Sequence, residues 1–192
     1  MLYNLSKSII ESIYGKEDSK LELYIYGLEL LFSSAVSTIL LLVLGIVIGA
    51  LVESIIFIVV FSALRIFAGG FHSRSFILCN LLTVLNFVIV LVIYRYFSEI
   101  LFSPVVFSIV FGLSFIICLF FAPVENINNP INYVLQKRHK IKALIVIIID
   151  AIIFIIFVYS FKMTQITIML PTLVSVDVFM VIPLFIIKEE QK

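Results

Sequence analysis

Long apolar stretches separated by short polar segments make up most of the chain. Six of them approach or exceed the roughly 20 residues that a helix needs to cross a hydrocarbon core about 30 Å thick. These stretches are residues 23–48, 51–68, 76–97, 100–122, 143–161 and 166–187. Alternating segments of about ten residues, which are typical of membrane barrels, do not occur. Because lipid requires backbone hydrogen bonds to be made internally, the pattern predicts an all-α, polytopic membrane protein with six transmembrane helices.

The first twenty residues carry a different pattern, typical of a short amphipathic helix in the membrane interface. One helical stripe bears the apolar side chains Leu2, Leu5, Ile9 and Ile13. Acidic residues interrupt the segment and no short apolar core ends in small residues, so we do not expect a cleavable signal peptide. We expect an interfacial helix within residues 1–20, with a solvent-facing leader as the alternative.

Composition excludes an ordinary soluble globule. Hydrophobic residues make up 63% of the 192 residues and charged residues 13%, and the mean hydropathy is +1.27. Soluble domains are only about half apolar and about a quarter charged.

The basic residues are distributed unevenly along the chain. With six spans and a cytoplasmic N-terminus, 11 of the 13 Lys and Arg residues lie inside: Lys7, Lys16, Lys20, Arg65, Arg74, Lys137, Arg138, Lys140, Lys142, Lys188 and Lys192. Only Arg95 and Lys162 lie outside. By the positive-inside rule, this predicts cytoplasmic N- and C-termini. The external turns are then short and fall at residues 49–50, 98–99 and 162–165.

Two cytoplasmic loops, residues 65–75 and 122–142, hold most of the polar residues. In the first, Gly69 and Gly70 permit backbone conformations that other residues avoid. His72 and Cys79 follow, and on one straight helix they would stand about 10 Å apart, too far for proton transfer. They can meet only if His72 lies on an irregular turn and Cys79 in the next helix. A cysteine beside an imidazole is a nucleophile arrangement, although two packing residues are the alternative.

The remaining cysteine and histidine give no metal site. Cys118 lies within an apolar span, where a small buried hydrophobe is the expected role. A zinc site needs three or four ligands, and the chain has 2 Cys and 2 His without such spacing. We therefore expect no metal and no cofactor.

A longer string gives this loop a family resemblance. The string is Arg65-x-x-x-Gly69-Gly70-x-His72-x-x-Ser75-x-x-x-Cys79. It resembles the core motif of the accessory gene regulator B (AgrB) family of membrane peptidases. The second loop, with Ala122-Pro123, Asn129-Pro130 and a basic run, is similar to that family's loop between spans four and five. Asn129 departs from the pattern, because members often carry a lysine there.

The resemblance covers nearly the whole chain and implies one membrane-embedded peptidase domain over residues 1–192. Such enzymes cut the C-terminal tail from a short quorum-sensing propeptide (AgrD-like), with His72 and Cys79 as catalytic residues. The cysteine forms a thioester, which an internal Cys or Ser of the propeptide attacks to give a thiolactone or lactone. The implied site lies at the cytoplasmic face. Expected partners are this propeptide and the bilayer, a homodimer stays open, and no nucleic acid is expected.

Three acidic residues in apolar spans need a partner or a purpose: Glu29, Asp150 and Asp177. Glu29 lies near the cytoplasmic end of its span and is the candidate to orient His72, with pairing to Arg65 as the alternative. Asp150 is the rival orienting residue. The sequence assigns no role to Asp177.

The other polar residues of the motif have two interpretations each. Ser75 either donates a hydrogen bond near the oxyanion or caps the third span. Arg65 either marks the membrane boundary or contacts a carboxylate of the substrate or the site. The basic residues Lys137, Arg138 and Lys140 either meet lipid headgroups or hold an acidic propeptide tail.

A protein of another class is the alternative. A small transporter or scaffold could bind or export a peptide without cutting it, and three acids within the membrane would suit a proton-coupled path. The string from Gly69 to Cys79 discriminates against it, because transport requires no nucleophile.

The topology can be tested by thiol labelling. Thr164→Cys should react with a membrane-impermeant maleimide in intact cells, because Thr164 falls in an expected external turn. Cys79 should be protected until the membrane is opened. Labelling of Cys79 from outside before Thr164→Cys would reverse the orientation.

Overall fold

The computed structural model describes residues 2–15, 21–70, 76–124 and 133–190. Within these ranges the chain is helical, and the elements are α1 (Leu2–Tyr14), α2 (Leu21–Val47), α3 (Leu51–Ala68), α4 (Phe76–Leu101), α5 (Pro104–Phe121), α6 (Tyr133–Ile155), the π-helix η1 (Ile156–Ser160), the 3₁₀-helix η2 (Thr164–Ile168) and α7 (Met169–Glu190). Six helices are long and apolar enough to cross a membrane. The predicted all-α fold, with six transmembrane helices and a short N-terminal helix, is confirmed.

Two helices extend beyond the predicted apolar stretches. α6 begins at Tyr133 rather than at residue 143, so the basic residues 137–142 lie on its first turns and not in a loop. Hydropathy indicates only the part of a helix that lies in lipid. Lysine and arginine are good helix formers, so a helix can begin in a basic segment before its apolar stretch. α4 leaves helical geometry at Phe97 (φ −118°, ψ 19°) but continues to Leu101. The turn between α4 and α5 therefore lies at residues 102–103, whereas the sequence predicted it at 98–99.

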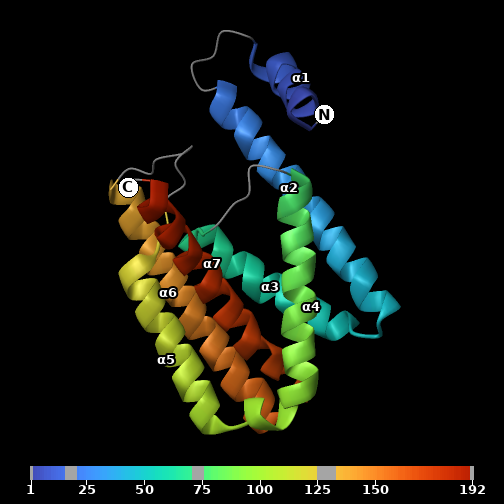
Figure 1. The fold of residues 1–192 in the computed structure, drawn as a ribbon, viewed down its shortest axis with the longest axis vertical. Helices are drawn as coiled ribbons and strands as arrows, with labels where there is room; N and C mark the ends of the chain where they lie inside the picture. Colours follow the sequence, from blue (N-terminus) through green and yellow to red (C-terminus); the bar gives the residue numbers. More distant parts are fainter. Residues whose placement is uncertain (1, 16–20, 71–75, 125–132, 191–192) are drawn as a thin grey trace.

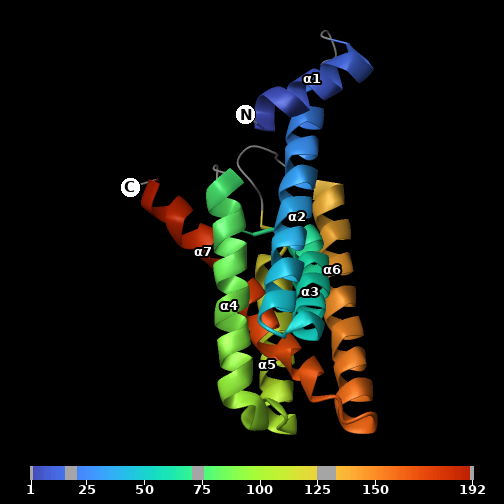
Figure 2. The ribbon, with the colours of Figure 1, turned by 90° about the vertical axis from the view of Figure 1, so that its right-hand side faces the viewer.

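The spans form a bundle whose connections alternate between its two ends (Figures 1 and 2). The ends of α3, α5 and α7 lie at the same end as the starts of α4 and α6. At the centre, α7 packs against α3, α4 and α5, and most of the span that η2 and α7 form together (Thr164–Ile182) is buried. Its side chains Leu170, Leu173 and Met180 are almost fully enclosed. This central helix organises the others around one core.

Aromatic side chains fill the spaces between these helices. Phe57 stacks on Phe61 with ring centroids 5.1 Å apart and tilts against Phe87 of α4. Phe154 of α6 lies 4.9 Å from the Phe107 ring of α5. The outward faces carry exposed apolar side chains such as Ile77, consistent with a surface that contacts lipid.

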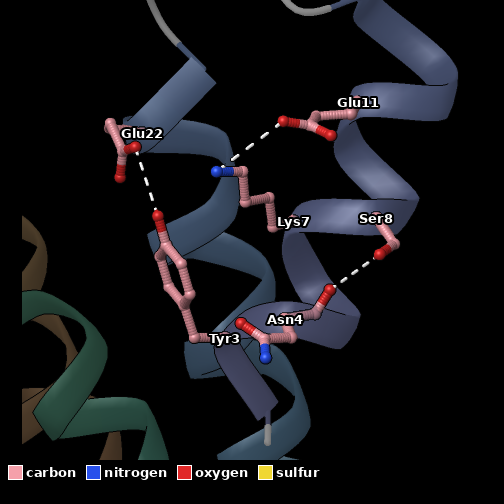
Figure 3. Close-up of polar contacts among 6 residues, drawn as sticks. All are labelled: Tyr3, Asn4, Lys7, Ser8, Glu11 and Glu22. Carbon is pink, nitrogen blue, oxygen red and sulfur yellow. Dashed lines mark hydrogen bonds and ion pairs between the residues drawn. The ribbon is translucent and has the colours of Figure 1, made fainter.

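The N-terminal helix lies against the start of α2 (Figure 3). Ser6 and Ile10 of α1 are buried, and the Tyr3 hydroxyl donates a hydrogen bond to Glu22 Oε1 of α2 at 3.4 Å. Leu5 and Ile13 of the apolar stripe stay 52% and 64% exposed, so α2 does not cover them. Their insertion into the membrane interface stays a prediction.

Polar side chains inside the bundle bond to neighbouring helices. Ser114 of α5 donates to Asp177 Oδ2 of α7 at 2.6 Å, which provides the partner that the sequence did not identify. Ser54 of α3 donates to the Leu41 carbonyl of α2 at 2.8 Å, beside Gly45. A Cβ at Gly45 would lie 2.7 Å from the Ser54 Cβ, so glycine permits this close approach.

Gly45→Ala should therefore destabilise the fold. Overpacking a tight contact costs about 1–3 kcal/mol, which should lower the thermal unfolding midpoint of the detergent-purified protein by several degrees. Gly112→Ala in α5 is the matched control, because nothing lies within 4 Å of the added Cβ. It should be neutral or stabilising by roughly 0.5–1 kcal/mol. Equal midpoints for the two variants would contradict the close packing of α2 on α3.

Candidate functional site

The paired glycines end α3 in a turn that only glycine accommodates. Gly69 has φ 74° and Gly70 has φ 127°. A Cβ at Gly69 would lie 2.5 Å from the Val124 carbonyl oxygen. The Val124 N–H donates to the Ala68 carbonyl at 2.9 Å, so the second loop satisfies a carbonyl that the helix end leaves unpaired. The two loops identified in the sequence therefore touch at Gly69.

The other side of this turn faces α7. A Cβ at Gly70 would lie 3.0 Å from the Phe179 carbonyl oxygen. The glycine pair is thus enclosed between the loop after α5 and the backbone of α7.

Arg65 lies one turn before the glycines and is partly buried. Its guanidinium carbon lies 5.4 Å from the Phe61 ring centroid and 5.1 Å from that of Phe179. Such cation–π contacts stabilise a positive charge away from bulk water. Arg65 also interacts electrostatically with Cys79. The positive charge of this α3 side chain therefore lies near the start of α4.

Cys79 lies in the first turns of α4 and is partly buried. Besides Arg65, it interacts electrostatically with Tyr26 of α2. Its carbonyl accepts a hydrogen bond from the Thr83 hydroxyl at 2.9 Å within the same helix. Side chains of α2 and α3 therefore lie within electrostatic range of the thiol.

A polar stripe on α2 faces this region. Tyr26, Glu29, Ser33 and Ser37 follow helical spacing and share one face. Tyr26 interacts electrostatically with both Glu29 and Cys79. Glu29 thus lies in the neighbourhood of the candidate nucleophile.

Two predicted residues, His72 and Ser75, lie outside the described residues, as does the Asn129-Pro130 pair. The approach of His72 to Cys79 and the role of Ser75 stay predictions.

Asp150, the rival orienting residue, lies deep in the bundle. It is on the buried face of α6 between Ile147 and Phe154, about 25 Å along the helix from its first residue. Cys79 lies only about 5 Å along α4, and both helices begin at the same end of the bundle. Among the described residues, Asp150 Oδ2 has no hydrogen-bond partner. Depth favours Glu29 over Asp150 as the neighbour of Cys79.

The basic run lies beside the last turn of α3. The Lys142 ammonium lies 5.4 Å from the Phe67 ring centroid, and the His139 ring lies 6.1 Å from it. Lys137 and Arg138 are exposed, whereas Lys140 is partly buried. The run therefore borders the glycine turn, with its first members open to solvent. In the described ranges no three His, Cys, Asp or Glu residues group to hold a metal ion.

Sequence reasoning missed two residues near the thiol, Tyr26 and Asn80. Tyr26 stands one turn before Glu29, and Asn80 directly follows Cys79. The available signal was a polar side chain within an apolar span. It does not identify the partners of that side chain, which lie on other helices.

These features define a multi-pass membrane protein with a polar site where several spans reach one end of the bundle. The family model described as "Accessory gene regulator B" matches residues 3–184. AgrB-like protein 2 of Clostridium perfringens (strain 13 / Type A) is 32% identical over 149 residues, which cover 74% of this chain and 70% of that protein. An AgrB-like protein of Clostridium perfringens (strain SM101 / Type A) is 30% identical over the same shares. No solved structure matches the chain.

The chain belongs to the accessory gene regulator B family. The resemblance found in the sequence is confirmed. The family takes part in quorum-sensing peptide processing at the membrane, in association with an AgrD-like propeptide.

Proposed function

We propose that the chain is a membrane cysteine endopeptidase that removes the C-terminal tail of a quorum-sensing propeptide. The observation that supports it best is the position of Cys79. This thiol lies at the start of α4, within electrostatic range of Arg65 on α3 and of Tyr26 on α2. The Gly69-Gly70 turn at the same end of the bundle leads into the segment that contains His72.

The chemistry begins with proton transfer from the Cys79 thiol to His72. The thiolate sulfur attacks the scissile carbonyl carbon, and the tetrahedral intermediate expels the tail's amine, which takes the proton from the imidazolium. A thioester between Cys79 and the propeptide results. An internal Cys or Ser of the propeptide then attacks this thioester, closes a thiolactone or lactone, and releases Cys79. Exchange between thiols keeps the acyl-transfer potential, whereas attack by water loses it, so the site must disfavour water.

Neighbouring groups have supporting roles in this proposal. Glu29 orients His72 and stabilises its imidazolium, as the third group of a triad does. Arg65 holds positive charge beside the thiolate, and Ser75 either donates to the oxyanion or caps α4. The exposed residues Lys137 and Arg138, with Lys140, contact the acidic tail of the propeptide.

The proposed orientation places the site at the cytoplasmic face, with both termini inside. The glycine turn, Cys79 and the basic run lie at one end of the bundle. The basic residues at that end support the cytoplasmic assignment through the positive-inside rule.

A transporter or scaffold remains the second candidate. The observation in its favour is Asp150, a buried acid whose Oδ2 has no partner among the described residues. Asp177 favours it less, because its bond to Ser114 provides a structural role.

Loss of the nucleophile should abolish cleavage. Cys79→Ala and His72→Ala should each stop propeptide processing, measured as release of the tail in proteoliposomes, while membrane yield is unchanged. Cys118→Ala is the matched control, because Cys118 is fully buried in α5 and should leave processing intact. Full processing by Cys79→Ala would refute the peptidase and favour the transporter or scaffold.

Glu29→Gln tests the orienting role. It keeps the size of the side chain but removes the charge, so cleavage should slow more than tenfold, about 1.4 kcal/mol of barrier, at normal yield. The measurement is the single-turnover rate of cleavage.

Two other variants identify the alternatives. If Glu29 only balances Arg65, Glu29→Gln should lower yield, and Glu29→Gln with Arg65→Gln should restore yield and cleavage. If Glu29→Gln cleaves at a near-normal rate and Asp150→Asn loses cleavage, Asp150 and not Glu29 orients His72.

A further inference from the structure

The residue after the candidate nucleophile links α4 to α2. Asn80 is 6% exposed. Its Oδ1 accepts a hydrogen bond from the Ser37 hydroxyl at 2.6 Å. Its Nδ2 donates to Ser33 Oγ at 3.4 Å and to the Phe76 carbonyl at 2.8 Å. One amide therefore joins two consecutive turns of α2 to the first turn of α4.

The orientation of this amide follows from its partners. A backbone carbonyl can only accept, so the Asn80 atom that faces the Phe76 oxygen must be the nitrogen. The amide oxygen then faces the Ser37 hydroxyl, which can donate. An aspartate of the same shape would place a carboxylate oxygen against the Phe76 carbonyl, so the site requires the amide.

Apolar anchoring is weak at the start of α4, where Val84 packs against the core only as a partly buried side chain. From Phe76 to Leu85, Asn80 is the only buried residue, and Ile77 and Leu78 are 75% and 44% exposed. The next buried positions are Asn86 and Phe87. The hydrogen bonds of Asn80 are therefore the main directional constraint on the rotation of the first turns of α4 about their axis.

Rotation of this helix end moves the thiol. Side-chain atoms lie about 5 Å from a helix axis, so a rotation of about 15° displaces Cys79 Sγ by about 1.3 Å. A misplacement of about 1 Å at a reacting atom can cost about a hundredfold in rate. A rotated α4 would also move Cys79 away from Tyr26 and Arg65, which lie on two other helices.

We propose that Asn80 is a positioning residue: through Ser33 and Ser37 it holds the rotation of α4, so that Cys79 faces the substrate carbonyl. This role rests on the proposed peptidase function. All three hydrogen bonds of Asn80 are made to protein groups, so its proposed effect is on the orientation of the nucleophile and not on substrate affinity.

The test uses the full chain in lipid nanodiscs, in the Cys118→Ala background that leaves one thiol. Asn80→Leu keeps the volume and favours the membrane, but removes all three hydrogen bonds. It should lower the kcat of propeptide cleavage at least tenfold with KM within twofold. The rate of alkylation of Cys79 by N-ethylmaleimide should change at least threefold, which reports on the thiol without any cleavage.

Matched variants separate positioning from general packing. Asn86→Leu removes another buried amide of α4, bonded to Ser175 of α7 at 3.2 Å, and should leave kcat and the alkylation rate within twofold. Ser37→Ala should impair kcat more than Ser33→Ala, because its bond is shorter. Ser34→Ala should leave kcat unchanged, because the Ser34 hydroxyl donates a hydrogen bond within its own helix, to the Leu30 carbonyl.

Cys79→Ala, measured in the same nanodiscs, separates this inference from the proposed function. If Cys79→Ala is inactive while Asn80→Leu cleaves at the normal kcat, the positioning role is wrong and the peptidase stands. If Asn86→Leu loses as much kcat as Asn80→Leu, the effect is general packing and the role is again wrong. Cleavage by Cys79→Ala would overturn both.

Discussion

The hydrocarbon core of the membrane offers no hydrogen-bond partners, and this constraint governs the whole structure. Each described span is a helix, and the backbone leaves helical geometry mainly where spans end. At the end of α3 the constraint requires a specific solution. The Ala68 carbonyl accepts from the Val124 N–H, and a glycine at position 69 lets the two backbones approach. The need to satisfy one helix end therefore joins the two loops that carry the family's motifs.

The same constraint acts on side chains within the bundle. Ser54 bonds to α2, Asn86 bonds to α7, and Asp177 accepts from Ser114 of α5. Contacts of this kind contribute about 0.6–2 kcal/mol each in membranes. Lipid tails are as apolar as leucine, so apolar contact alone discriminates poorly between helix rotations. Interhelical hydrogen bonds are directional, and they therefore set the register of helices whose surfaces are otherwise uniformly apolar.

The candidate site lies at the end of the bundle with the glycine turn. A charged Arg65 persists there because the Phe61 and Phe179 rings cover its guanidinium. Lys142, in the basic run of α6, packs against Phe67 of α3. A peptide that lies along the membrane surface would meet positive charge and a partly buried thiol together. In the proposed function, that combination suits acyl transfer, because the basic residues hold the acidic tail of the propeptide and the nucleophile is sheltered from water.

The sequence by itself determined the six spans, the glycine turn and Cys79 as the candidate nucleophile, because hydropathy and backbone sterics are local properties. It also led to the family, since the string from Arg65 to Cys79 is contiguous. The start of α6 at Tyr133 could not be predicted from hydropathy, because the helix begins well before its apolar stretch does. The partner of Asp177, the contact of Gly69 with Val124, and the link from Asn80 to α2 were decided by tertiary structure alone. Each joins residues distant in the chain, and a hydrogen bond between two helices leaves no periodic signal in either.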